Sequence, residues 1–301
     1  MSRIHDALKR AEQERASSMG THVEPAFNPP PDVQPENMPE MPSLQPSPAA
    51  MPGRGAATTY ESLLARCPQP DWSPDPRTML FFHEDDNRIG AEEFRTLRSR
   101  LYQIREKMQL KRLLVTSALP KEGKSFVAAN LAQVMVRQHG RRALVIDADL
   151  RNPGMHRHFG APPQPGLSEY LLGECDEFAA LQRGPMENLF FMPAGRLAGS
   201  APELLSNGRL KLLLQRVEPL FDWVIMDSSP VIPVSDATLV ASCCDGILMV
   251  VRSNATPSDL ARRAREEFPD KLLLGVVLNG APSGKLSQSK YYYGEAVNSP
   301  T

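Results

Sequence analysis

The sequence has few of the features that define secreted, zinc-stabilised or membrane-spanning proteins. Its four cysteines form no CxxC pair and have no histidine at zinc-ligand spacing, which favours free thiols in a reducing cytoplasm over a disulfide or zinc framework. No window reaches the roughly 18 consecutive apolar residues that a membrane-spanning helix requires. Residues 1–15 are charged throughout and lack the apolar core of a signal peptide. We expect a cytoplasmic protein with no membrane span of its own.

Net charge is also nearly absent. The 34 Lys and Arg residues almost balance 35 Asp and Glu residues, for a formal charge of −1. Proteins that bind nucleic acid or anionic membranes usually carry a visible basic excess. The balance therefore argues against a nucleic-acid partner.

Proline is abundant but unevenly spread. Of 29 prolines, 14 lie between Pro25 and Pro76, among Ser, Ala, Met and Glu residues that cannot bury enough apolar area to offset the entropy of ordering. We therefore expect residues 17–79 to be a disordered tether. Its one interruption, at residues 59–66, is expected to form a helical turn that docks.

The first 16 residues have helical periodicity. Ile4, Leu8 and Ala11 share one face, and the opposite face is charged. A helix this short is marginal alone, so it is either a docking element for a partner, which we favour, or a frayed tail.

The remaining residues, about 80–284, are long enough for one α/β domain. Apolar runs typical of strands occur at 113–116, 143–146, 189–192, 223–226, 246–251 and 272–278. Helical patterns occur at 94–108, 125–138, 203–217, 236–243 and 257–268. Buried strands separated by helices predict a doubly wound, mainly parallel sheet with helices on both faces. Ligands of such sheets bind beyond the carboxyl ends of the strands.

A phosphate-binding loop follows the first expected strand. Residues 118–125 read ALPKEGKS, with Ala118 where the general P-loop pattern has its first glycine. Backbone amides and the positive end of the next helix would hold phosphates, Lys124 would reach their oxygens and Ser125 would face Mg²⁺. The residues expected to contact the nucleotide are Pro120, Lys121, Glu122, Gly123, Lys124, Ser125 and Phe126.

Three carboxylates follow later strands. Asp147 and Asp149 end one strand and Asp227 ends another. Any one of them is explained equally well as a helix cap. Three at the edge that carries the P-loop instead indicate a metal site, with two carboxylates for Mg²⁺ and one for proton transfer.

Taken in order, these motifs resemble the bacterial tyrosine autokinases of capsule and exopolysaccharide synthesis. The resemblance rests on the P-loop, a DxDxR segment at 147–151 and a DxxP segment at 227–230, and it spans about residues 88–293. The DxDxR segment is the discriminating motif. The related partitioning ATPases carry a signature Lys at the second P-loop position, where this chain has Leu119.

The resemblance implies roles for these residues. Asp147 would accept the tyrosine proton and Lys124 would contact the transferred phosphate. Ser125, Asp149 and Asp227 would hold Mg²⁺, with ATP as the phosphate donor. Asn279 either reads the adenine, as its position in related nucleotidases suggests, or is a turn residue.

It also implies an interface and a set of acceptors. Glu92, Arg95 and Arg98 form an ExxRxxR stripe that joins kinase subunits head to tail into a ring, although such a stripe is also typical of ordinary surface ion pairing. Tyr291, Tyr292 and Tyr293 would be autophosphorylation sites in a flexible tail at residues 285–301.

The function implied is ATP-dependent tyrosine autophosphorylation that regulates polysaccharide polymerisation and export. The chain resembles the stand-alone type, which a separate membrane chain-length regulator activates and recruits to the inner face of the cytoplasmic membrane. Two alternatives stay open: a nucleotide-switched oligomeric ATPase scaffold without tyrosine transfer, and an adaptor that acts through its N-terminal helix.

Overall fold

The computed structural model describes residues 59–82, 90–196 and 199–281. The expected N-terminal helix, most of the tether and the tyrosine tail lie outside the described residues.

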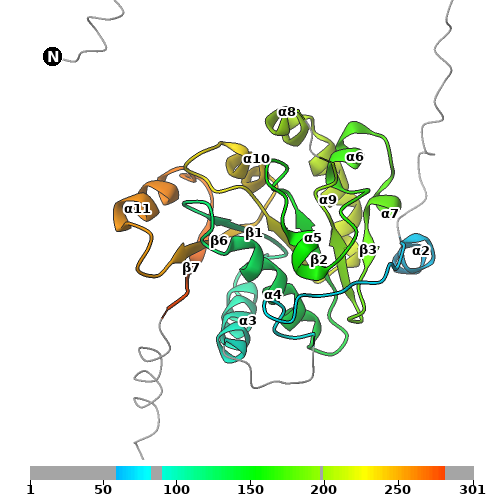
Figure 1. Ribbon diagram of the computed structural model, residues 1–301, viewed down its shortest axis with the longest axis horizontal. Coiled ribbons are helices and arrows are strands. Elements are labelled where there is room, and N and C mark those ends of the chain that lie inside the picture. Colours follow the sequence, from blue (N-terminus) through cyan, green and yellow to red (C-terminus); the bar gives the residue numbers. More distant parts are fainter. Residues whose placement is uncertain (1–58, 83–89, 197–198, 282–301) are drawn as a thin grey trace, which may run out of the picture. The chain divides into compact units, whose positions relative to one another are not determined.

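One sheet of seven strands organises this part of the chain (Figure 1). The strands are β1 (Arg112–Ser117), β2 (Ala143–Asp147), β3 (Gln182–Arg183), β4 (Leu189–Met192), β5 (Trp223–Asp227), β6 (Gly246–Arg252) and β7 (Leu273–Asn279). Their order is β3-β4-β2-β5-β1-β6-β7, and every neighbouring pair is parallel except β3 and β4. The predicted mainly parallel sheet is confirmed.

Helices cover both faces of this sheet (Figure 1). They are α2 (Tyr60–Arg66), α3 (Ala91–Arg105), α4 (Lys124–Val136), α5 (Met155–Phe159), α6 (Leu167–Leu172), α7 (Glu177–Ala180), α8 (Ala201–Ser206), α9 (Arg209–Val217), α10 (Asp236–Ser242) and α11 (Ser258–Glu266), with a 3₁₀ turn at Glu218–Leu220. None of the helices described is long and apolar enough to cross a membrane.

The strands alternate between two apolar clusters because successive side chains point to opposite faces. In β2, Leu144 packs with the cluster that includes α8, α9 and α10, whereas Val145 packs with the cluster of α3 and α4. Both side chains are fully buried. The apolar runs of the inner strands are therefore explained by a sheet with helices on both faces, whereas Val276 and Leu278 of the edge strand β7 are 56% and 58% exposed.

The six predicted strands are all present, whereas the helix expected at 203–217 is divided. Gly208 has a left-handed φ of 82° and separates α8 from α9. This backbone conformation cannot continue a helix, and glycine adopts it without the steric penalty of a Cβ atom. The sequence patterns did not anticipate the short elements α6, α7 and β3.

The predicted tether differs from the structure at its C-terminal end. The helical turn expected at 59–66 is present as α2, and it docks through the buried Leu63. The chain then stays packed on the domain as far as residue 82, with Met79 fully buried and Phe81 2% exposed. Apolar residues among the last prolines supply the buried area that the preceding tether composition lacks.

Candidate active site

The P-loop leads from β1 into α4 at the carboxyl edge of the sheet (Figure 1). Gly123 precedes α4 with φ of 96°, and no described side chain caps this helix end. Its first amides therefore face the position where an anion binds most favourably. An added Cβ on Gly123 would lie 2.1 Å from Nδ2 of Asn279, so the loop requires glycine here both for its backbone conformation and for space.

Neighbouring strand ends hold the loop in shape. The buried Glu122 carboxylate accepts hydrogen bonds from the backbone N of Leu119 at 2.7 Å and from the Thr256 hydroxyl. Arg252 donates to the carbonyl of Lys121 at 3.0 Å. Asn279 donates to the carbonyl of Glu122 at 2.9 Å. Glu122 and Asn279 thus support the loop through direct contacts.

The three predicted carboxylates converge on the P-loop. Asp147 on β2 is paired in register with Asp227 on β5, and both are fully buried. Lys124 Nζ lies 2.7 Å from Asp149 Oδ2 and 3.7 Å from Asp227 Oδ2. The Ser125 hydroxyl donates to Asp227 Oδ2 at 2.5 Å. The structure therefore brings together Lys124, Ser125 and all three aspartates.

Asp147 is held by backbone amides. Its Oδ2 accepts hydrogen bonds from the N–H groups of Gly154 at 3.3 Å and Met155 at 3.2 Å, where α5 begins. Its Oδ1 accepts from the N–H of Asp149 at 3.2 Å. These bonds fix the carboxylate beside the other acidic groups.

Burial and charge shift the ionisation of the site. Burial, together with the negative charge of Asp227, raises the pKa of Asp147 to about 7. Burial also raises the pKa of Asp227, against the opposing effect of Lys124. Burial alone would lower the pKa of Lys124, but the charges of Asp227 and Asp149 outweigh it and raise that pKa above its ordinary value. Lys124 is therefore a permanent cation among carboxylates.

The donor atoms fit Mg²⁺. Asp227 Oδ1 is buried and has no hydrogen-bond partner in the described part of the chain, and Ser125 lies against the other oxygen. Hard oxygen ligands of this kind suit Mg²⁺, which binds through one or two carboxylates plus phosphates and water. The described residues contain no group of three His, Cys, Asp or Glu side chains that could hold a metal ion by themselves.

The predicted interface residues have partners within the chain. Arg95 pairs with Glu92 at 2.5 Å on the same helix, and Arg98 donates to the carbonyl of Val134 on α4 at 3.0 Å. The predicted acceptor residues Tyr291, Tyr292 and Tyr293 lie outside the described residues.

Two contributors to the site escaped prediction from sequence. The Ser229 hydroxyl donates to Asp149 Oδ1 at 2.9 Å, and Thr256 holds Glu122. Ser229 lies inside the DxxP segment, so that motif could have indicated its place in the site. Thr256 follows β6, and no motif surrounds it.

No protein-family model matches the chain, but individual known proteins do. Tyrosine-protein kinase YwqD of Bacillus subtilis is 34% identical over 206 residues, which cover 68% of this chain and 86% of that protein. The succinoglycan biosynthesis transport protein ExoP of Rhizobium meliloti is 34% identical over 203 residues, 66% of this chain but 26% of its own length.

A solved structure has the same fold. The kinase domain of the Escherichia coli tyrosine kinase ETK superposes with a TM-score of 0.62 at 29% identity, covering 67% of this chain and 80% of that domain. Together with the likeness to YwqD, this shows that the chain belongs to the bacterial tyrosine-protein kinases of capsule and exopolysaccharide synthesis.

Proposed function

We propose that this kinase uses ATP to phosphorylate the tyrosines of its own tail, Tyr291, Tyr292 and Tyr293, and that this regulates polysaccharide polymerisation and export. The observation that carries the proposal is the contact of Lys124 and Ser125 with Asp149 and Asp227, beside the buried Asp147. The arrangement supplies a cation, a phosphate loop and a proton acceptor within one site.

Each group has a distinct role in phosphoryl transfer, a reaction that depends mainly on positioning and on neutralising charge. The P-loop amides and Lys124 bind and orient the phosphates of ATP. Asp147 accepts the proton of the tyrosine hydroxyl. Ser125, Asp149 and Asp227 would hold Mg²⁺, which neutralises negative charge on the phosphates when bound.

Lys124 also pairs with two of the carboxylates of the site. Its ammonium group lies against Asp149 and Asp227, where it offsets the repulsion between buried carboxylates. Binding of ATP and Mg²⁺ would give Lys124 the phosphates, and the carboxylates the metal, as further partners.

The remaining proposals concern location and assembly. ExoP is named as a transport protein, and this chain matches about a quarter of it. We therefore propose that a separate membrane protein, a chain-length regulator, activates this kinase and recruits it from the cytoplasm to the inner face of the membrane. The Glu92, Arg95 and Arg98 stripe is the proposed contact between subunits of a ring.

The test compares the wild-type chain with a variant in which Tyr291, Tyr292 and Tyr293 are all changed to Phe. Both proteins are incubated with ATP and Mg²⁺, and phosphotyrosine and released phosphate are measured. We expect the variant to lose most phosphotyrosine while it still hydrolyses ATP. A wild-type chain that hydrolyses ATP without forming phosphotyrosine would instead be a nucleotide-switched scaffold.

A further inference from the structure

Residues 72–82, here called the strap, lie directly against α5. The backbone N–H of Ser73 donates to the carbonyl of Gly160, and that of Asp75 donates to the carbonyl of His158, both at 3.1 Å. An added Cβ on Gly160 would lie 1.9 Å from the Ser73 carbonyl oxygen. The strap and the end of α5 therefore meet backbone to backbone.

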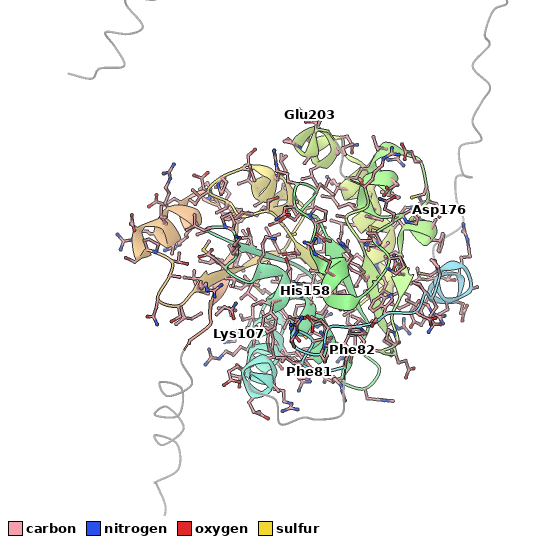
Figure 2. All side chains as sticks on the ribbon, in the orientation of Figure 1. Phe81, Phe82, Lys107, His158, Asp176 and Glu203 are labelled. Carbon is pink, nitrogen blue, oxygen red and sulfur yellow. The ribbon has the colours of Figure 1, made fainter. Side chains whose placement is uncertain are left out.

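Aromatic packing reinforces this contact. The Trp72 ring lies 5.0 Å from the ring of Phe159, the last residue of α5, and 6.0 Å from that of Phe191 on β4. At the other end of the strap, Phe82 packs edge-on against Phe159. Figure 2 labels Phe81, Phe82 and His158 in this region of the molecule.

The strap is also bonded to α4, the helix that begins with Lys124. Two fully buried polar side chains of α4, Asn130 and Gln133, satisfy the strap backbone. Asn130 accepts from the N–H of Leu80 and donates to the carbonyl of Thr78, both at 2.8 Å. Gln133 accepts from the N–H of Phe81 at 3.2 Å. Buried amides in a helix core are retained only where such partners exist.

The two helices carry the two halves of the candidate site. α4 provides Lys124 and Ser125, and the start of α5 donates the Gly154 and Met155 amides that hold Asp147. α5 has only five residues, so it has little stability of its own. Besides the burial of Met155 at its start, the strap contacts at its far end therefore help to determine where its first amides lie.

We propose that the strap is a positioning element for phosphoryl transfer, with Trp72 its main anchor, and that it fixes the Asp147 carboxylate, through α5, relative to the phosphate loop on α4. The proposal rests on the function proposed above. A displacement of about 1 Å between reacting groups costs up to about 100-fold in rate, so even a small movement of α5 affects catalysis.

The test uses the full-length chain with Trp72→Ala. Trp72→Phe, which keeps an aromatic ring on Phe159, is the rescue variant. Tyr60→Phe is the matched control, because it removes the hydrogen bond of the same N-terminal segment to Asn188. Asn188 lies at the amino end of β4, whereas the P-loop follows the carboxyl end of β1. Hydrogen exchange is measured without nucleotide, and kcat and the KM for ATP are measured separately.

We expect Trp72→Ala to speed exchange about tenfold at residues 154–160 while β5 and β6 keep their protection. Phosphotyrosine formation should lose about tenfold in kcat with KM within about twofold, and Trp72→Phe should restore most of both. Unchanged exchange in α5, or faster exchange throughout the sheet with loss of activity in proportion, would overturn the proposal. If the wild type forms no phosphotyrosine, the proposed function fails, whereas the exchange result still decides whether the strap holds α5.

Discussion

Asp147 is the residue on which proton transfer depends in the proposed reaction. Changing Asp147 to Asn keeps the size of the side chain but removes the base, and general bases contribute about 10²–10⁴ to rate. We expect phosphotyrosine formation to fall by that factor, as measured by the initial rate with saturating ATP. Nucleotide binding should persist, because Asp147 makes none of the expected phosphate contacts. A variant with wild-type rate would assign the base elsewhere.

The ionisation of Asp147 predicts how kcat/KM depends on pH. Its pKa is raised to about 7 in the free enzyme by burial and by Asp227, and kcat/KM reports free-enzyme ionisations. The unprotonated form is the active one, so kcat/KM should fall as the pH decreases through about 7. A profile that stays flat down to pH values near the ordinary aspartate pKa of about 4 would contradict the assignment.

Single residues of the site were predictable where a motif fixed their place on a strand end. Asp149, Asp227 and Lys124 meet because parallel strands deliver their carboxyl ends to one edge. The hydroxyl of Thr256 was not predictable, since it is 134 residues from Glu122 in sequence and nothing local marks it. Such long-range hydrogen bonds depend on the packed fold.

At the scale of elements, Asp245 joins the start of β1 to the turn before β6. Its carboxylate accepts from the backbone N–H groups of Lys111 at 2.9 Å and Arg112 at 2.8 Å, and it pairs with the Arg112 guanidinium. Burial opposes ionisation, but the bonds from Arg112 and Lys111 outweigh it and lower the pKa of Asp245. The charged form is thus favoured in the folded state.

We therefore expect Asp245→Asn to lower the free energy of unfolding by about 1.5–3 kcal/mol, the usual range for hydrogen bonds to a charged group. Because the folded-state pKa is lowered, this stabilisation is present above the unfolded pKa of about 4 and is lost as the pH falls through the folded value. Urea unfolding at neutral and acidic pH checks both statements. Equal stability of variant and wild type at neutral pH would refute them.

Long elements were predictable and short ones were not. Apart from β3 and the partly exposed β7, the strands are apolar runs of the kind that a buried parallel sheet requires. α6 and α7 have six and four residues, too few for a 3.6-residue period to be detected. The packing of the C-terminal part of the tether was not predicted, because prolines dominate its composition and single residues such as Met79 provide its buried contacts.

At the scale of the whole molecule, the proposed ring depends on α3. Glu92 is exposed and its partner Arg95 is half-buried, so this pair is accessible to a neighbouring subunit. Arg98 instead serves α4 through Val134, so changing it would also disturb the fold. We expect Glu92→Ala with Arg95→Ala to shift ATP-loaded protein from oligomer to monomer, measured by light scattering. Arg100→Ala, an exposed position on the same helix, should leave the mass unchanged.

An oligomer of unchanged mass in the double variant would show that the stripe is not part of the interface. A wild-type chain that stays monomeric at every concentration would show that no ring forms.

The most direct test of the proposed function is mass spectrometry of the tail after incubation with ATP and Mg²⁺, for the wild type and for Lys124→Met. We predict phosphate on one or more of Tyr291, Tyr292 and Tyr293 in the wild type and none in the variant, because methionine fills the space of Lys124 without its charge. Equal phosphorylation of the two proteins, or modification that leaves all three tyrosines untouched, would contradict the proposed function.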